Sequence, residues 1–523
     1  MKEMANNSYF NRMNETNTIR KVIAASSVGT MIEWYDFYIF GMLAKTISTQ
    51  FFPEGNSTAA LLSTLAIFAA GFIVRPFGAL VFGRLGDLIG RKYTFLLTLV
   101  LMGGSTFLIG LVPGYKSIGI AAPLLVLLLR LIQGLALGGE YGGAATYVAE
   151  HAPANKRGYY TSWIQTTATI GLFVALGVIM LVKLNMSDAE FNEPWGGWRY
   201  PFWISILLVI ISVYIRLKME ESPLFAKLKS EGKTSVNPLK ESFSHRANFK
   251  MVLLALFGAV MGQGVIWYTG QFYAQSFLET KCNIEFGQSR TILLWAIVFA
   301  TPFFLFFGWL SDKIGRKWIM MAGLLLGIVT YRPIFSYFLE KTDVKQWNVG
   351  MSFTPGEEIL KSDTLNLKGT NHIVEKSTRT ILFADGRSFV ENKSDTVILE
   401  AHNTITKPGQ VTYTNRHLDQ GTYWKFIGLV FFLILYVTMV YGPIAAFLVE
   451  MFPTKIRYTS MSLPYHIGNG VFGGLVPFIG LLLTTTYPRD PLVGLWYPIG
   501  VAALCLIIGT IYLTNKIDKD ITD

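Results

Sequence analysis

Long apolar runs are the feature of this sequence that most restricts what the chain can fold into. A run of about 20 apolar residues crosses the roughly 30 Å hydrocarbon core of a bilayer as a helix. Twelve such runs occur, at about 22–44, 61–82, 93–112, 123–147, 159–183, 200–217, 250–277, 289–310, 319–338, 424–448, 459–484 and 493–514. Only 15% of the 523 residues are charged, against about a quarter in soluble proteins. The sequence therefore predicts an all-α integral membrane protein with twelve transmembrane helices.

The basic residues lie mostly in alternate loops of this pattern. If the N-terminus is cytoplasmic, the cytoplasmic loops hold the clusters at 84–92, 156–157, 313–317 and 455–457. An excess of Lys and Arg on the cytoplasmic side is the rule for membrane proteins. We therefore expect a multi-pass protein of the inner (plasma) membrane with both termini cytoplasmic. The same distribution explains the net charge of +11 without a nucleic-acid partner. Residues 1–21 are polar, so we expect no cleaved leader.

Two pairs of similar segments recur in the same order. GRLGDLIGRK (83–92) resembles GWLSDKIGRK (308–317), and YVAEHAPANKRGYYTS (147–162) resembles FLVEMFPTKIRYTSMS (447–462). The pattern indicates two copies of a six-helix unit, an arrangement found in one class of secondary transporters. The predicted domains are a first half, 1–217, a cytoplasmic linker, 218–249, and a second half made of 250–338 and 424–523.

The second copy contains an insertion. Asp87 and Glu150 are 63 residues apart, whereas Asp312 and Glu450 are 138 apart. The extra residues fall in 339–423, after the ninth predicted span and hence on the extracytoplasmic side of the membrane. TRTILFADGRSFV alternates around Asp385-Gly386, a strong hairpin pattern, and DTVILEA and QVTYT are further strand candidates. We expect a small β-rich extracytoplasmic insert rather than a disordered loop. It would dock a protein partner or shield the outer vestibule.

The repeated loops predict a cytoplasmic gate. A carboxylate is favoured at a helix N-terminus, where Asp87 can lie, and Arg91 can reach Glu150 at the cytoplasmic end of the fourth predicted span. Such ion pairs would hold the cytoplasmic side shut and break when it opens. A loop that only orients the chain in the membrane is the alternative, and the duplication favours the gate. The predicted gate residues are Gly83, Asp87, Arg91, Glu150, Asp312, Arg316 and Glu450.

These loops resemble the signature loop of the major facilitator superfamily, and a closer resemblance is to its metabolite:proton symporter family. The matching segments are EWYDF (33–37), RPFG (75–78), RLIQGLALGGEYGGA (130–144), WGGWRYPF (195–202), EESPLF (220–225) and EMFPTKIRYT (450–459). That family includes carriers of 2-oxoglutarate, citrate, shikimate, and proline with betaine. The resemblance implies the major facilitator fold and proton-coupled uptake by alternating access. The insert departs from the family's usual short loop.

Glu33 and Asp36 lie three residues apart within the first apolar run. A charge at mid-bilayer costs about 2.5–3.5 kcal/mol on insertion scales, and intramembrane acids are usually functional. Their spacing puts both on one helix face. We favour a proton-coupling role for Asp36, with Glu33 close behind. A pair of structural hydrogen-bond donors is the alternative.

Arg130 in the fourth run needs a partner within the membrane. It would pair with Asp36 or Glu33 when the site is empty and with a substrate carboxylate when it is full. A permanent salt bridge within the first half is the alternative. Gln133 and Tyr141 continue its face and Glu140 lies beside it, so these four form the first predicted substrate-binding group.

A second predicted substrate-binding group lies in the second half. Gln263, Trp267 and Gln271 form a stripe in the seventh run, and Tyr465 and His466 lie in the eleventh. A purely structural role is the alternative for each. No catalytic constellation, metal-ligand spacing or phosphate loop appears, so we expect no enzyme activity, no metal and no cofactor.

The sequence thus predicts a proton-coupled symporter for a small organic acid or zwitterion. Its expected partners are this substrate, protons and the lipid bilayer, and we expect a monomer. Two alternatives remain: a uniporter or antiporter on the same scaffold, and a nutrient sensor whose outer domain binds a ligand or protein.

Overall fold

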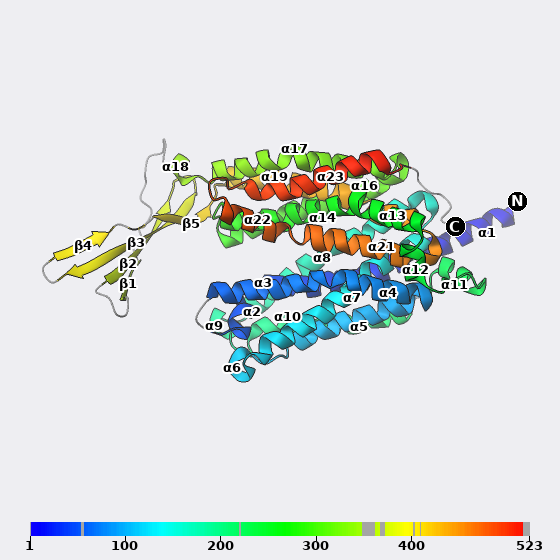
Figure 1. Cartoon of the computed structure of the whole chain (residues 1–523), viewed down its shortest axis with the longest axis horizontal. Helices are drawn as coiled ribbons and strands as arrows, with labels where there is room; N and C mark the ends of the chain where they lie inside the picture. Colours follow the sequence, from blue (N-terminus) through cyan, green and yellow to red (C-terminus); the bar gives the residue numbers. More distant parts are fainter. Residues whose placement is uncertain are drawn as a thin grey trace.

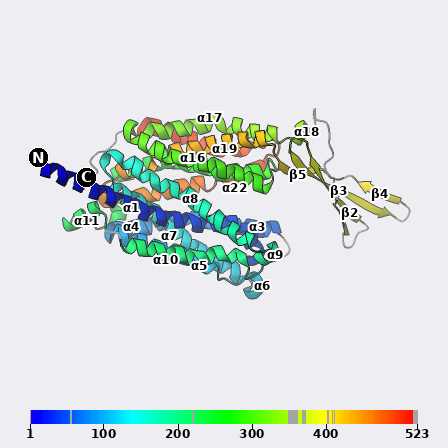
Figure 2. The same cartoon turned by 180° about the vertical axis from the view of Figure 1, so that it is seen from behind.

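The computed structural model describes residues 2–53, 57–218, 221–347, 361–366, 372–400, 403–407, 409 and 411–515. Most of them are helical, and the long helices run side by side along one axis (Figures 1 and 2). Eleven helical segments of the described part are long and apolar enough to cross a membrane. The predicted helical membrane architecture is confirmed at this level. Most of the first predicted run, 22–44, lies in helix α1, Lys2–Met42, which is not among those eleven.

The first half of the chain forms one layer of helices, drawn blue to cyan in Figure 1. The helix is interrupted at Val74, between α3 and α4, because Pro76 cannot donate a backbone hydrogen bond to the preceding turn. The elements of this layer are α1 Lys2–Met42, α2 Ala44–Phe51, α3 Ser57–Ile73, α4 Arg75–Leu88, α5 Arg91–Ile109, α6 Tyr115–Ile118, α7 Ala121–His151, α8 Arg157–Leu184, α9 Asp188–Phe191 and α10 Tyr200–Leu217.

Two short helices, α11 Pro223–Ser230 and α12 Pro238–Phe243, follow at the end of the bundle where α1 begins. Each starts with Pro, whose fixed φ suits the first helical turn. The preceding Ser222 and Asn237 cap them by accepting backbone N–H bonds from Phe225 and Lys240. We call this end of the bundle the termini end.

The second half forms the other layer, drawn green to red in Figure 1. Residues 246–280 form one long helical segment with two π-helical turns, Leu256–Val260 and Thr269–Tyr273, and a third π-helical turn, Ile467–Gly473, separates α21 from α22. Such turns often mark functional sites. The helices of this layer are α13 Arg246–Ala255, α14 Met261–Tyr268, α15 Ala274–Thr280, α16 Phe286–Ile314, α17 Lys317–Lys341, α18 Val344–Trp347, α19 Gln420–Tyr441, α20 Ile444–Met451, α21 Arg457–His466, α22 Val476–Thr486 and α23 Trp496–Tyr512.

The layers pack reciprocally, since α4 contacts α21 of the other layer while α8 contacts α16. The repeated segments therefore meet each other's half. Helix α4 ends in the segment 83–92 and α16 in the segment 308–317. Each packs against a helix of the other half, α21 or α8, that begins within the second repeated segment of that half. This pairing brings the predicted gate residues of the two halves together.

A five-stranded antiparallel sheet projects from the opposite end of the bundle, here the sheet end (Figures 1 and 2). Its strands are β1 Lys361–Asn366, β2 His372–Leu382, β3 Ser388–Glu400, β4 Asn403–Lys407 and β5 Thr412–His417. The order is β1-β2-β3-β4, with β5 also pairing β3. The expected hairpin joins β2 to β3, and Gly386 takes a φ of 87° in its turn. Helices α17 and α19 extend further into the predicted insert than its boundaries 339–423 allowed.

The base of the sheet has its own aromatic core. Phe389 is 1% exposed and lies 5.3 Å from Tyr413, 6.0 Å from Phe383 and 6.3 Å from Trp347 by ring centroids. Phe389 and Trp347 belong to the same continuous core as the second layer of helices. The sheet is therefore anchored to the second half by buried contacts.

Replacing Phe389 by Ala should loosen this base. Truncating a buried Phe costs about 3–5 kcal/mol through lost burial and the cavity left behind. Amide hydrogen exchange at 377–395 should accelerate in Phe389→Ala, while exchange in α5 and α7 stays unchanged. Acceleration throughout the helices instead would mean that the sheet is not a separate unit of stability.

Candidate functional site

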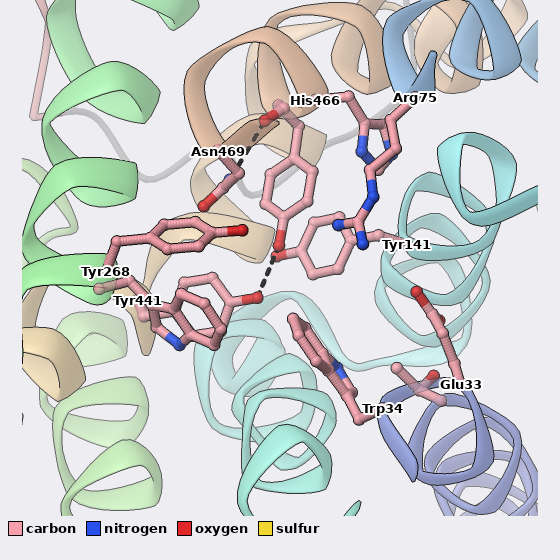
Figure 3. A pocket seen from close by; sticks show the side chains of 11 residues that line it. Glu33, Trp34, Arg75, Tyr141, Tyr268, Tyr441, His466 and Asn469 are labelled. Atoms are coloured by element: carbon pink, nitrogen blue, oxygen red, sulfur yellow. Dashed lines mark hydrogen bonds between the residues drawn. The ribbon is translucent and has the colours of Figure 1, made fainter. Parts of the chain in front are cut away.

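A small cavity lies between the two layers, and eleven residues line it (Figure 3). It encloses about 20 Å³, enough for one water molecule and too little for an organic solute. The lining side chains therefore have to separate before a solute can enter. They are Thr30, Glu33 and Trp34 from α1, Arg75 from α4, Tyr141 from α7, Trp267 and Tyr268 from α14, Tyr441 from α19, Tyr465 and His466 from α21, and Asn469.

One acid and one guanidinium line the cavity. Glu33 is 6% and Arg75 7% exposed, and both come from the first layer. The guanidinium of Arg75 packs 4.3 Å from the ring centroid of Phe72 and 5.1 Å from that of Phe37. Within the described part of the chain, Oε2 of Glu33 and Nε of Arg75 have no hydrogen-bond partner. These buried polar atoms are available to a ligand with complementary groups: a hydrogen-bond donor for Glu33 and an acceptor for Arg75.

Aromatic rings make up most of the remaining wall. Trp34 lies 5.3 Å from Trp267 across the interface between the layers, by ring centroids. Tyr141 and Tyr465, again from opposite layers, stack at 3.6 Å with an interplanar angle of 4°. The hydroxyl of Tyr465 is 2.6 Å from that of Tyr441. The six tryptophan and tyrosine rings of the lining are Trp34, Tyr141, Trp267, Tyr268, Tyr441 and Tyr465.

Amide and imidazole groups supply the polar side of the second layer. The amides of Gln263 and Asn469 bond each other in both directions, at 2.9 and 3.0 Å. Nε2 of His466 is buried and has no hydrogen-bond partner among the described residues. Asn469 and His466 thus present hydrogen-bonding groups to the cavity, and Gln263 supports the first of them.

Arg130 lies outside the cavity wall, in a buried cluster within the first layer. Its guanidinium donates to Gln133, and Gln133 donates to Thr106 at 2.8 Å. The guanidinium also packs 4.6 Å from the ring of Phe40. Asp36 is 0% exposed, and neither of its carboxylate oxygens has a hydrogen-bond partner among the described residues. The predicted pairing of Arg130 with an acid of α1 therefore stays a prediction.

Glu140 also lies outside the wall. It forms an ion pair with Arg216 of α10, and its other oxygen accepts a 2.8 Å bond from Thr98. Gln271 is 7% exposed in the second π-helical turn and does not line the cavity either. Of the predicted substrate group, the cavity therefore gathers Tyr141, Trp267, Tyr465 and His466, with Glu33 from the predicted proton pair.

Six lining positions were not predicted as site residues: Thr30, Trp34, Arg75, Tyr268, Tyr441 and Asn469. Trp34 follows Glu33 directly, and Arg75 precedes the Pro that breaks the second apolar run, so both carried a detectable pattern. Tyr441 lies in an apolar run at the end of α19, just before Gly442-Pro443. Nothing in its local sequence distinguishes it from a lipid-facing tyrosine.

At the termini end, the two halves contain matching ion pairs. Arg91 lies 2.9 Å from Asp87 and 3.8 Å from Glu150. In the second half, Arg316 lies 2.7 Å from Asp312 and 2.9 Å from Glu450. These are the contacts that the repeated motifs predicted, and their gating role remains a prediction.

Further bonds at this end cross between the halves. Asp87 accepts from the backbone N–H of Thr459 at 2.9 Å and from its hydroxyl at 2.7 Å, near the start of α21. Asp312 accepts 2.8 Å bonds from the backbone N–H groups of Gly158 and Tyr159, at the start of α8. Each acid thus sits at a helix N-terminus of the other half, where a carboxylate is favoured.

Two arginines form further ion pairs between the two halves. Arg457 lies 3.1 Å from Glu150, and Arg157 lies 3.3 Å from Glu450. All four side chains are at least nine-tenths buried. Gly83 permits this approach, since a Cβ there would lie 3.0 Å from the Cα of Thr459. The termini end is therefore closed in this conformation.

Tyr458 adds an aromatic plug to the closed end. Its ring enters a socket between α4 and α7, where a Cβ on Gly86 would lie 2.2 Å from the ring and one on Gly143 2.6 Å from the hydroxyl. The hydroxyl donates to the backbone carbonyl of Gly139. The glycines of the fourth apolar run therefore accommodate a side chain of the opposite half as well as neighbouring helices.

Comparison with known proteins identifies the type of molecule. Residues 21–251 match the family model "Sugar (and other) transporter". The inner membrane metabolite transport protein YhjE of Escherichia coli (strain K12) is 34% identical over 492 residues, covering 94% of this chain and 93% of that protein. The proline/betaine transporter of the same organism is 35% identical over 325 residues, covering 61% of this chain and 64% of that protein.

Among solved structures, the proton:xylose symporter XylE of the major facilitator superfamily, bound to 6-bromo-6-deoxy-D-glucose, has a TM-score of 0.65 to this chain. The two share 16% sequence identity, and the match covers 95% of this chain and 96% of that one. At this identity the likeness establishes the fold.

Substituting Glu150 by Gln should weaken the closed termini end. The change leaves Arg457 and Arg91 with one carboxylate fewer in a buried site, and breaking a buried ion pair typically costs about 3–5 kcal/mol. Amide hydrogen exchange at 454–460 should accelerate by about tenfold or more.

The matched control is Glu241→Gln, which removes a partly exposed pair with Lys455 at the same end. Exposed pairs contribute about 0–1 kcal/mol, so exchange should hardly change. Equal acceleration in both variants would contradict the role of the buried network.

Proposed function

The chain belongs to the major facilitator superfamily of transporters and, within it, to the metabolite:proton symporter family. We propose that it carries a small zwitterionic metabolite together with a proton, by alternating access. In this proposal α1 supplies a twelfth span, both termini are cytoplasmic and the sheet is extracytoplasmic. The halves 1–217 and 250–338 with 424–523 move against each other, joined by the linker 218–249. The insert 339–423 belongs to the second half.

Alternating access requires a site that can be closed on either side. The cross-half ion pairs close the cytoplasmic side, and the cavity lies where the layers meet. Towards the sheet end, Tyr38 stacks on Phe272 at 6.1 Å and Trp34 contacts Trp267 at 5.3 Å, each pair joining the two layers. This aromatic contact is the proposed outer gate. The conformation then corresponds to an occluded state, in agreement with the small cavity.

The composition of the cavity wall carries the substrate assignment. A carboxylate would pair with Arg75, whose planar guanidinium suits bidentate recognition. An ammonium group would lie against the rings of Trp34, Trp267 and Tyr268 and near Glu33. Aromatic cages of this type recognise quaternary ammonium groups, with about 2 kcal/mol per desolvated contact. An organic acid without an ammonium group would use Arg75 alone and leave the cage unused.

Two carboxyl groups are available for the proton. Glu33 faces the cavity, so its protonation would change the charge that a substrate meets. Asp36 lies behind it beside the Arg130 cluster, so its protonation would release Arg130 from an acidic neighbour. One proton moving through about 150 mV supplies about 3.5 kcal/mol. That energy corresponds to roughly a few-hundred-fold accumulation of substrate.

The first test measures coupling. In liposomes with an inward proton gradient, we expect the purified protein to accumulate at least one labelled zwitterion from a panel of betaines, amino acids and organic acids. Asp36→Asn and Glu33→Gln should lose this accumulation, because neither amide carries a proton into the site. Asp36→Asn should retain substrate exchange across the membrane.

The outcomes of this test distinguish a symporter from a uniporter and from a sensor. Accumulation that ignores the gradient would refute proton coupling and favour a uniporter. A protein that binds a member of the panel without moving it would favour the sensor.

The second test measures substrate class through one tryptophan. Trp267→Leu should raise the half-saturation concentration for a betaine about tenfold, because the substitution removes one face of the cage. The half-saturation concentration for a plain organic acid should not change. Arg75→Gln should raise the value for both, since both carry a carboxylate. Trp318→Leu is the control, because Trp318 is 51% exposed and remote from the lining. Equal loss of betaine and organic acid in Trp267→Leu would refute the cage.

A further inference from the structure

The inserted sheet is joined to the helical body at a specific junction. The last residues of β5 lie beside the connection between α15 and α16, where Arg416 and Ile284 form a parallel bridge. The backbone N–H of Arg416 donates to the carbonyl of Asn283 at 2.8 Å, and that of Glu285 donates to the carbonyl of Arg416 at 2.8 Å. The sheet thus pairs through one bridge with the connection that follows the segment 246–280.

Side chains strengthen this junction. Nη1 of Arg416 donates to the carbonyl of Cys282 at 3.1 Å and to that of Thr342 at 2.7 Å. The side-chain amide of Gln288 in α16 accepts from the backbone N–H of Leu418 at 2.8 Å and donates to its carbonyl at 3.1 Å. Arg416 therefore links three parts of the second half: the end of α15, the end of α17 and the sheet.

The backbone at the junction is unusual. Asn283 has a φ of 51° and Asn415 a φ of 50°, and they are the two non-glycine residues with positive φ in the described part of the chain. Each directly precedes a residue of the bridge. Asn tolerates this left-handed conformation better than most residues. Strained positions of this kind persist where the surrounding structure requires them, often at functional sites.

The helical segment that ends in this junction also forms the proposed outer gate. Trp267 and Phe272 contact Trp34 and Tyr38 of the first half, and α15 continues the same helix outward to the Cys282 carbonyl. A π-helical turn at 269–273 contains the gate residue Phe272 and lies between Trp267 and the clamped end of the segment. Opening the cavity towards the sheet end requires this segment to move.

We propose that Arg416 is a positioning residue of the outer gate, which it couples to the inserted sheet by holding the outer end of the segment 246–280. The coupling rests on the proposed alternating access. The closed gate is stabilised by the clamp, so loosening the clamp favours the outward-open state. The sheet then acts as a lever on the gate, and a protein that held the sheet would alter the rate of opening.

The test uses a reporter remote from the junction. Tyr38 is 4% exposed and belongs to the first half, on the other side of the gate from the clamp. Tyr38→Cys in a Cys282→Ser, Cys505→Ser background leaves one thiol, because the chain has two cysteines. Its reaction with a membrane-impermeant maleimide, applied to spheroplasts carrying the full-length protein, measures how often the outer gate opens.

Adding Arg416→Gln should accelerate labelling about fivefold or more, because bonds from a charged donor to two carbonyls are lost. Arg416→Lys, which retains a charged donor, should restore most of the slow rate. The control is Lys393→Gln, which removes the same charge from the sheet where Lys393 pairs with Asp395. Its labelling rate should match that of the parent within about twofold.

An unchanged rate in an inserted Arg416→Gln protein would overturn the proposal and leave the clamp a purely structural support of the sheet. If Arg416→Gln does not reach the membrane, Gln288→Leu removes both bonds to Leu418 and carries the same expectation. Labelling does not require transport. Faster labelling in a protein that moves no substrate would therefore support the clamp while refuting the proposed function.

Discussion

Buried charge at the termini end is the constraint on which the rest of this structure depends. Asp87 and Arg91 are each 1% exposed, and such charges are tolerated only with partners close by. Some of these partners come from the other half of the chain: Thr459 donates to Asp87, and the carbonyl of Thr454 accepts from Arg91. The halves therefore cannot separate at this end without hydrating both acids and bases. Hydration of the exposed charges offsets part of the lost interaction energy, so opening this end costs free energy but remains accessible.

The duplicated sequence gives this end its reciprocity. Asp87 caps a helix that begins at Arg457, and Asp312 caps one that begins at Arg157. The two capping contacts form and break together, because both depend on the same movement of one half against the other. A packed interface of this kind has two discrete arrangements rather than a continuous range. That property is what a transporter needs if its cavity is to face one side at a time.

Much of this arrangement was predictable from the sequence, because it depends on local patterns. Apolar runs gave the helices, the repeated loops gave the gate contacts, and alternation around Asp385-Gly386 gave the hairpin of the sheet. The sequence did not reveal how each helix is rotated about its own axis within the bundle. Glu140 and Tyr141 are neighbours in α7, yet Glu140 pairs with Arg216 while Tyr141 reaches the cavity. Periodicity assigns residues to a face, but the neighbour of that face follows from packing. Arg75 and Trp34 were not predicted as site residues for this reason. The junction at Arg416 depends on segments more than a hundred residues apart.

The central claim is that the two ends of the bundle open in alternation around one cavity. Spin labels at Lys156 and Lys455 report the termini end, and labels at Lys45 and Gln275 report the sheet end. Distances for both pairs should be measured by pulsed electron resonance in one lipid preparation, with and without substrate and at two pH values. The account predicts that the population with a long distance at one end has a short distance at the other, and that substrate with low pH shifts the balance. Two distances that lengthen together, or that never change, would contradict it.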